Sequence, residues 1–342
     1  MASPSQAIAA IAILSRMSDE DERWLSLVGS HGRRLYLTPG DTRAEAVLAS
    51  RGAVYPRSNA LWRAALGLRE WDVIVDVGCN YGEMLAEVVA PRGSRVLAYE
   101  PSSAVLPALR RTIGELPFLV ELREVALSDR SGTAQFIVDE TWSGRSSLEA
   151  GAAGESHRVR TETVELTTID AELADWAGGS ICMKIDVEGH DLRVLAGAMQ
   201  ALRRASAAVV MVEILHLPIE QILQLATEWR MYVADRETGA LVRLPAHGTE
   251  AASALLESRW IYEQDALLCH GDVSPDGLDD EEGALAAFVR AVDAATTARE
   301  IAADEVSPAA ALLEREIDAM RRTLSWRITA PLRAIRRAIG RD

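Results

Sequence analysis

Three charged side chains close an otherwise apolar stretch of this 342-residue sequence. Lys184, Asp186 and Glu188 alternate with apolar residues, so in an extended strand all three point to one side. A buried central strand is expected to be apolar on both faces, and unpaired buried charge is costly. These groups must therefore pair, bind a metal ion or line a binding site. The alternative without chemistry is a Lys184–Asp186 ion pair, with Glu188 as an acid at a helix N-terminus.

A second expected strand, over 208–214, also ends in an acid. Glu213 closes its apolar run, and His216 follows shortly after. His190 likewise follows the end of the strand expected over 181–186. A histidine titrates near neutral pH, so His190 and His216 are candidate general bases. The alternative for each is an ordinary loop residue.

A glycine turn follows the first expected strand of the chain, over 73–77. This strand contains Asp76, and Gly78 and Gly82 then lead into a helix expected over 82–90. Such a turn exposes backbone N–H groups and lets a polar ligand approach the main chain closely. The Gly-x-x-x-Gly spacing matches neither the dinucleotide fingerprint nor a P-loop.

Glu100 ends the next expected strand, Arg95–Tyr99, and precedes Pro101. It lies 18 positions beyond Gly82. A carboxylate at this place in a βαβ unit is positioned to accept both ribose hydroxyls of an adenosine cofactor. The alternative is a solvated helix-capping acid.

These residues belong to an alternation of strands and helices that begins near residue 71. Further strands are expected over 119–125 and 181–186, and shorter ones near 230–234 and 266–270. Helices are expected over 103–114, 190–203 and 218–229, and an insertion holds strands over 134–138 and 162–168. Repeated βα units predict an α/β fold with a mostly parallel sheet, helices on both faces and ligands beyond the carboxyl ends of the strands.

Composition limits the classes of function. A net charge of −15 argues against nucleic acid as a substrate, because phosphate binding needs a basic surface. The three cysteines are far apart, which disfavours both a disulfide framework and a zinc site. Without an apolar stretch of about 18 residues or a signal peptide, the expected location is cytoplasmic.

Four regions are expected along the chain. A helical N-terminal region (1–70) precedes the main domain (71–271), and an acidic linker (272–307) leads to an amphipathic, arginine-rich helical tail (308–342). Residues 320–342 hold seven arginines and one aspartate. The tail would dock on the anionic inner face of a membrane or on a partner enzyme, or remain a solvated helix that balances the acidic linker.

Seven motifs occur in one order and together resemble the FkbM-type family of S-adenosylmethionine (SAM)-dependent methyltransferases. They are Asp76-Val-Gly-Cys-Asn-Tyr-Gly82, Tyr99-Glu100-Pro101, Glu124-Val-Ala-Leu-Ser-Asp129, Ser146-Ser147-Leu148, Leu166-Thr-Thr-Ile-Asp170, Lys184-Ile-Asp-Val-Glu-Gly189 and Val212-Glu213. The resemblance implies a Rossmann-like class I fold with a seven-stranded sheet, SAM as the methyl donor and a hydroxyl group as the acceptor.

The resemblance also implies roles for individual residues. The methionine part of SAM would be surrounded by Asp76, Gly78, Asn80 and Gly82. Glu100, next to Pro101, would hold the ribose, and the adenine would face Ala126, Leu127 and Ser128. Ser147 would lie in a loop over the cofactor. The acceptor side would comprise Lys184, Asp186, Glu188 and Glu213, whereas the spacing of His216 varies in the family.

The expected reaction is O-methylation of a sugar or surface glycan. Asp186 or Glu188 would take the hydroxyl proton or orient the hydroxyl, with Lys184 fixing the carboxylate. A divalent metal held by Asp186, Glu188 and Glu213 is the alternative. A small natural product is the alternative acceptor, and a non-catalytic scaffold that keeps the fold is the alternative function.

Overall fold

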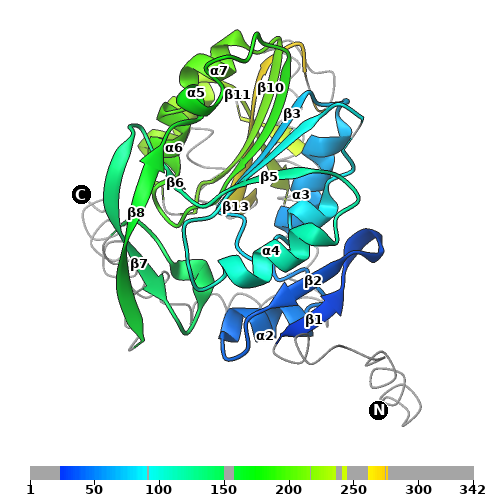
Figure 1. The fold of residues 1–342 in the computed structure, drawn as a ribbon. Coiled ribbons are helices and arrows are strands. Elements are labelled where there is room, and N and C mark those ends of the chain that lie inside the picture. Colours follow the sequence, from blue (N-terminus) through cyan, green and yellow to red (C-terminus); the bar gives the residue numbers. More distant parts are fainter. Residues whose placement is uncertain are drawn as a thin grey trace, which may run out of the picture.

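The computed structural model describes residues 24–90, 92–149, 158–215, 217–235, 241–244, 261–273 and 275. An eight-stranded sheet forms its centre (Figure 1). In spatial order its strands are β12 (Leu241–Arg243), β11 (Arg230–Asp235), β13 (Ile261–Gly271), β10 (Ala207–Glu213), β9 (Ser180–Ile185), β3 (Val73–Val77), β4 (Arg95–Tyr99) and β5 (Val120–Arg123).

The sheet is mostly parallel. The strands from β10 to β5 run in parallel, whereas β13 is antiparallel to β10 and β11, and β12 is antiparallel to β11. This confirms the predicted α/β class, and β12 adds an eighth strand to the seven expected. Strands β3, β9 and β10 are buried along their whole length, as expected for strands that are covered on both faces.

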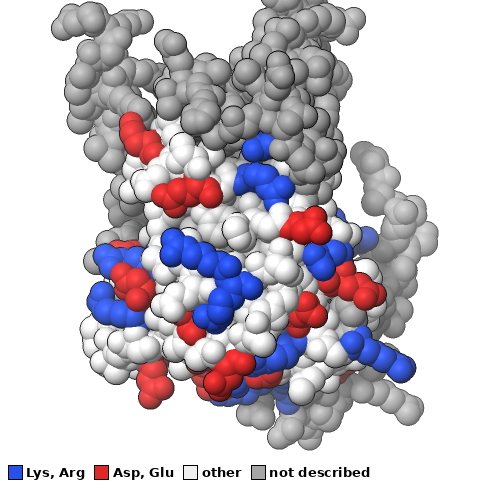
Figure 2. Space-filling model, turned by 90° about the horizontal axis from the view of Figure 1, so that it is seen from above, with Lys and Arg blue, Asp and Glu red and all other residues white. Residues whose placement is uncertain are grey.

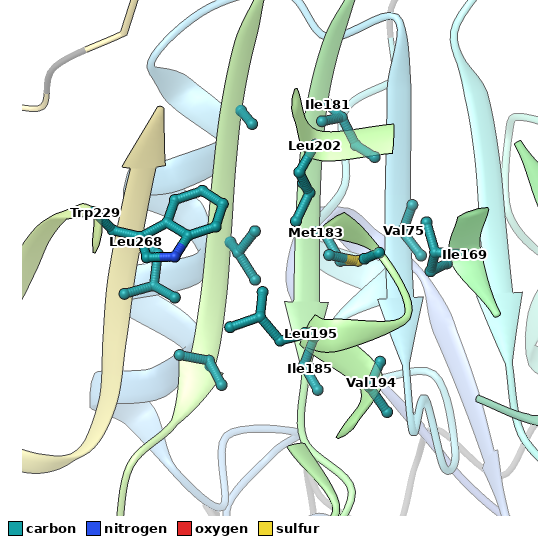
Figure 3. Packing of buried hydrophobic residues seen from close by; sticks show 14 of the residues in the cluster. Val75, Ile169, Ile181, Met183, Ile185, Val194, Leu195, Leu202, Trp229 and Leu268 are labelled. Atoms are coloured by element: carbon teal, nitrogen blue, oxygen red, sulfur yellow. The ribbon is translucent and has the colours of Figure 1, made fainter. Parts of the chain in front are cut away.

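Helices cover both faces of the sheet. One face packs against α3 (Pro56–Gly67) and α4 (Leu106–Gly114). The other packs against α5 (Ile169–Glu172), α6 (Asp191–Ala196), α7 (Met199–Arg204) and α8 (Ile219–Glu228). Figure 3 shows this second core, in which Ile181, Met183 and Ile185 of β9 meet Leu195 and Leu202. Successive β9 side chains therefore alternate between the two cores.

The predicted insertion forms a separate three-stranded sheet. Its order is β6 (Ala126–Leu127), β8 (Val159–Thr167) and β7 (Gly132–Asp139). A 3₁₀ turn, η4 (Ser143–Arg145), follows β7. The two strands expected in this insertion are therefore confirmed.

The expectation of a helical N-terminal region is wrong for residues 25–37. Strands β1 (Leu25–Val28) and β2 (Arg34–Leu37) form an antiparallel hairpin around the 3₁₀ turn η2 (Ser30–Gly32), and helix α2 (Thr42–Ala49) follows. The hairpin is anchored on α4, because the Tyr36 amide donates to Thr112 Oγ1 at 3.0 Å. Packing against α4 favours the extended conformation here. The boundaries of the predicted regions stay predictions.

The helix expected over 82–90 is wrong as well, because only the 3₁₀ turn η3 (Leu85–Glu87) forms. Arg33 of the hairpin donates to the carbonyl oxygens of Ala86 and Val88, so these groups are satisfied outside a helix. The backbone becomes extended at Val88. The helix expected over 190–203 is two helices, α6 and α7. The acidic linker (from residue 276) and the tail lie outside the described residues.

Candidate active site

Four ionisable side chains lie on one face of the central sheet, at the end where the parallel strands finish. Asp76, Lys184, Glu213 and Asp265 come from the adjacent strands β3, β9, β10 and β13. Residues two positions away in these strands lie on the same face, and one of them, Cys182, packs into the core on the α3 side of the sheet. All four are buried. Strand alternation therefore brings residues from four distant parts of the sequence to one place.

Lys184 joins two of the acids. Its Nζ lies 3.4 Å from Oδ1 of Asp76, its neighbour across the parallel ladder, and 3.3 Å from Oδ2 of Asp186. Burial opposes charge on Lys184, but Asp186 and Asp76 together raise its pKa, so the ammonium group stays charged. Burial raises the pKa of Asp76 despite this lysine. The predicted Lys184–Asp186 ion pair is confirmed.

The chain leaves β9 through a strained segment that carries two further acids. Glu188 has a positive φ of 51°. Asp191 accepts hydrogen bonds from the amides of Val187 and Gly189, at 3.2 and 3.1 Å. Burial and the nearby Asp186 raise the pKa of Glu188 to about 8 and that of Asp191 to about 6. Extended alternation thus ends before Glu188, but Glu188 still lies near Asp186.

Glu213 has a partner that the sequence did not indicate. In the antiparallel pair of β10 and β13 it stands directly opposite Asp265. Ser58 of α3 donates a hydrogen bond to Asp265 Oδ2. Burial raises the pKa of Asp265 to about 7 and that of Glu213 well above its usual range, the latter reinforced by Glu188. We call Asp186, Glu188, Asp191, Glu213 and Asp265 the carboxylate cluster.

The glycine turn packs directly against the end of β9. Gly78 and Gly82 have positive φ angles of 73° and 85°. A Cβ atom on Gly78 would lie 2.1 Å from the carbonyl oxygen of Asp186. Glycine is therefore required at position 78, both for the backbone conformation and for this contact. The predicted cofactor turn and the predicted acceptor side are adjacent.

Glu100 faces the same turn. Its Oε2 accepts the Asn80 amide and its Oε1 accepts the Ser102 amide, each at 2.9 Å. Burial raises its pKa to about 7, although both amides oppose this. Each carboxylate oxygen can accept a second hydrogen bond. Pro101 beside it is partly buried.

Two residues of the N-terminal segment form hydrogen bonds and an ion pair with the glycine turn. Arg43 of α2 lies 2.5 Å from Glu83 Oε1 and donates to Asn80 Oδ1 at 3.1 Å. Asp41 accepts the Tyr81 hydroxyl at 2.6 Å. It also accepts the amide of Ser143 in η4 at 3.2 Å. These contacts were not predicted, because they join residues that are far apart in the sequence.

His190 is bonded through both ring nitrogens. Its Nε2 lies 2.9 Å from Ser128 Oγ, and its Nδ1 lies 2.7 Å from Glu149 Oε1. Ser147 donates to the carbonyl of Glu188 at 2.9 Å, which ties the 146–149 loop to the end of β9. His190 therefore acts as a bridge in this structure, and its role as a base stays a prediction.

The side chains expected near the adenine are buried. Leu127 packs into the core beside β9, and Ala126 packs into the small sheet. Their contact with a cofactor stays a prediction, as does the role of Ser128. His216 lies outside the described residues.

Two further features bear on the predicted functions. Within the described ranges, no group of three or more His, Cys, Asp or Glu residues is arranged to hold a metal ion. The carboxylate cluster thus lends the metal alternative no geometric support. Among the same residues, no helix is both long and apolar enough to cross a membrane.

One curated protein is similar to part of this chain in sequence. The hexuronic acid methyltransferase AglP of Haloferax volcanii is 32% identical over 147 residues, which cover 41% of this chain and 56% of that protein. The chain thus spans about half the length of this curated relative.

Two solved structures resemble the chain distantly. The geranyl diphosphate methyltransferase in complex with SAM is 17% identical, with a TM-score of 0.34 over 68% of this chain and 91% of that one. The precorrin-6y C5,15-methyltransferase from Geobacter metallireducens is 12% identical, with a TM-score of 0.31 over 62% and 85%.

The match to a protein family covers the elements that form the site. Residues 76–240 match the family model described as the methyltransferase FkbM domain. This segment begins at Asp76 and includes the glycine turn, Glu100 and the ends of β9 and β10. The resemblance seen in the sequence is confirmed for residues 76–240, which match the methyltransferase FkbM domain.

Proposed function

We propose that this chain is a SAM-dependent O-methyltransferase that acts on a hydroxyl group of a sugar or surface glycan. The observation that carries the proposal is the contact between Gly78 and the Asp186 carbonyl, which any added Cβ would destroy. It sets the turn that would bind the donor beside the acid that would meet the acceptor. The curated relative is by its name a hexuronic acid methyltransferase, which supports a sugar acceptor.

The residues of the turn fit SAM. Asp76 Oδ1 lies 3.4 Å from Lys184 Nζ, and neither oxygen accepts a hydrogen bond within the described part of the chain, so Asp76 keeps acceptor capacity for a ligand group. Glu100 retains acceptor capacity for two ribose hydroxyls. Gly78, Asn80 and Gly82 would surround the methionine part, with Ser147 in the neighbouring loop.

When bound, SAM supplies an electrophilic methyl group on a sulfonium. The chain must hold the acceptor hydroxyl in line with that methyl and accept its proton as the new C–O bond forms and the C–S bond breaks. Asp186 is the better-placed base, because its side chain is 40% exposed and Lys184 holds one oxygen. Glu188 is the second candidate, since its raised pKa of about 8 makes its ionised form a stronger base than an ordinary carboxylate.

The proposal is tested by titrating SAM into the purified chain and then assaying methyl transfer to sugar acceptors by mass. Asp186→Asn should retain SAM binding and lose about 100-fold in rate or more, the usual scale for a proton-transfer residue. Absent SAM binding would favour the scaffold alternative. Full activity in chelator would remove the metal alternative, and an unimpaired Asp186→Asn variant would remove the role of Asp186.

We also propose that the arginine-rich segment 308–342 makes a peripheral contact with an anionic membrane. Seven arginines within residues 320–342 support this proposal. Vesicles with and without anionic lipid would be sedimented with the full chain and with a chain ending at residue 307. Equal sedimentation of the two chains would exclude a membrane contact through this segment.

A further inference from the structure

Ser102 carries a buried hydroxyl group that has no partner among the described residues. Only 2% of its surface is exposed, and its Oγ atom forms no hydrogen bond within this part of the chain. A buried hydroxyl without a partner costs free energy, so each such group in a folded protein calls for an explanation.

A helix cap does not explain this hydroxyl. A serine before a helix commonly accepts a hydrogen bond from a nearby amide through its side chain. Here the amides of Val105 and Leu106 both donate to the carbonyl oxygen of Ser102, each at 3.2 Å, and α4 has no side-chain cap. The main chain therefore holds the turn before α4, and the hydroxyl remains available to a ligand.

The main chain on both sides of this hydroxyl is fixed. The Ser102 amide donates to Glu100 Oε1 at 2.9 Å. Ser103 is tied to strand β8, because its hydroxyl donates to Glu162 at 2.6 Å and accepts from Arg160 at 2.7 Å. Since the Ser102 hydroxyl belongs to the same residue as the amide that bonds to Glu100, it lies close to the carboxylate that would hold the ribose.

The chemistry of this pair suits a ribose hydroxyl. A ribose hydroxyl that donates its hydrogen to Glu100 keeps lone pairs that can accept a further hydrogen bond. An ionised carboxylate cannot supply that hydrogen, whereas a serine hydroxyl can. Glu100 and Ser102 together would therefore satisfy both the hydrogen and the oxygen of the same ribose group.

We propose that Ser102 binds the cofactor by donating a hydrogen bond to a ribose hydroxyl that Glu100 accepts. The inference rests on the proposed function and deepens it, because it assigns a second residue to the ribose and makes the site selective for an intact ribose. A site built to bond a hydroxyl rejects an analogue that lacks it, since the polar groups of the site are then left unpaired.

The test measures two properties of the full chain, its affinity for S-adenosylhomocysteine by isothermal titration and its urea midpoint without ligand. Ser102→Ala should weaken binding by about fivefold to tenfold, the loss expected for one hydrogen bond. It should not lower the urea midpoint, because the hydroxyl that it removes has no partner in the free protein. A purely structural serine would show the reverse pattern.

Ser180→Ala is the matched control. Ser180 is 1% exposed, and its hydroxyl donates to Asp72 Oδ2 at 2.7 Å. It lies at the start of β9, at the opposite end of this strand from the site. The control substitution should lower the urea midpoint and leave the affinity for S-adenosylhomocysteine unchanged.

Analogues of S-adenosylhomocysteine that lack the 2′ or the 3′ hydroxyl locate the contact. For the analogue without the contacted hydroxyl, the effect of Ser102→Ala should fall below about twofold. Unchanged affinity of Ser102→Ala for S-adenosylhomocysteine, a lowered urea midpoint in this variant, or an equal loss for all three ligands would overturn the inference. No binding of S-adenosylhomocysteine by the native chain would count against the proposed function itself, so the two failures are distinguishable.

Discussion

At the scale of single residues, Lys184 balances the charges of its acidic neighbours. Its ammonium group is within 3.4 Å of Asp76 and 3.3 Å of Asp186, in a place where water cannot replace it. Removing one member of a buried ion pair leaves the other charge uncompensated, which costs more than the pair itself contributes. The fold therefore depends on this lysine, whatever its part in catalysis.

Lys184→Met tests this dependence. The substitution keeps the length of the side chain but leaves Asp76 buried without a cation, so the free energy of unfolding should fall by about 3 kcal/mol. Urea unfolding followed by circular dichroism measures the change. The control is Arg110→Met, because Arg110 pairs with Glu124 and both side chains are exposed, by 52% and 43%, so it should cost less than about 1 kcal/mol. Equal losses in the two variants would contradict the argument.

Gly78→Ala tests the contact between the turn and β9. An alanine at a φ of 73° is strained by about 1–2 kcal/mol, and its Cβ would also collide with the Asp186 carbonyl. Gly93 isolates the strain alone, because its φ is 96° and nothing lies within 4 Å of an added Cβ. Gly78→Ala should therefore destabilise the protein more than Gly93→Ala and lose SAM affinity, measured by unfolding and by titration. Similar effects at both positions would show that the contact is unimportant.

The sequence indicated the acids that follow local patterns and missed those that depend on tertiary pairing. Glu100 and Asp186 were found because each stands at the end of an apolar strand. Asp265 was missed because its hydrogen-bond partner, Ser58, lies 207 positions earlier in the chain. Long-range juxtaposition is determined by the assembled sheet and cannot be read from local spacing.

At the scale of elements, the N-terminal segment supports a turn that it does not belong to. Helix α2 lies before the residues that match the family, but Arg43 contacts Asn80 and Glu83 within the turn. Asn80 has a positive φ of 46° and donates its amide to Glu100. The conformation of the turn is thus held from both sides.

Arg43→Ala should weaken SAM binding by about tenfold, or about 1.4 kcal/mol, because Asn80 loses the support that fixes its amide toward Glu100. Isothermal titration of SAM measures this change. Arg34→Ala is the control in the same segment, since Arg34 bonds only within the hairpin to Ser26, at 3.2 Å, among the contacts seen. If both variants bind SAM as the native chain does, α2 does not support the turn.

The expected elements were correct where burial on both faces produced long apolar runs, as in β3, β9 and β10. They were wrong where a tertiary contact decided the conformation. Arg33 of the N-terminal hairpin takes the carbonyls of Ala86 and Val88, which prevents a helix after the turn. The hairpin itself depends on α4, through the bond between Tyr36 and Thr112. Neither contact can be predicted from the local pattern of apolar residues.

At the scale of the whole molecule, charge is arranged differently on the surface and at the site. On the face seen in Figure 2, basic and acidic side chains are interspersed. The carboxylate cluster instead brings five acidic side chains together, and most of them are buried. The chain as a whole carries a net charge of −15. Folding therefore brings together carboxyl groups that lie far apart in the unfolded chain, and this makes stability depend on pH.

The direction of that dependence follows from the raised pKa values. Folding raises the pKa of Glu188 to about 8, those of Asp265 and Glu100 to about 7 and that of Asp191 to about 6. In the unfolded chain these groups titrate near pH 4. Between about pH 4 and pH 8 the folded state binds more protons, so its stability falls as the pH rises. The lowered pKa of Asp72 acts in the opposite sense, but only below about pH 4.

Without added cofactor, the free energy of unfolding should therefore fall by about 3 kcal/mol or more from pH 5 to pH 8, since one pKa unit corresponds to about 1.4 kcal/mol. Urea unfolding at several pH values measures the slope. Asp265→Asn should flatten it, because an amide cannot ionise where the buried carboxyl must. Glu165→Gln on the exposed side of β8 should leave the slope unchanged. If the free energy of unfolding increases over this range instead, ionisation of the cluster does not destabilise the fold. Groups other than Lys184 and Arg43 then compensate the charge of the acids.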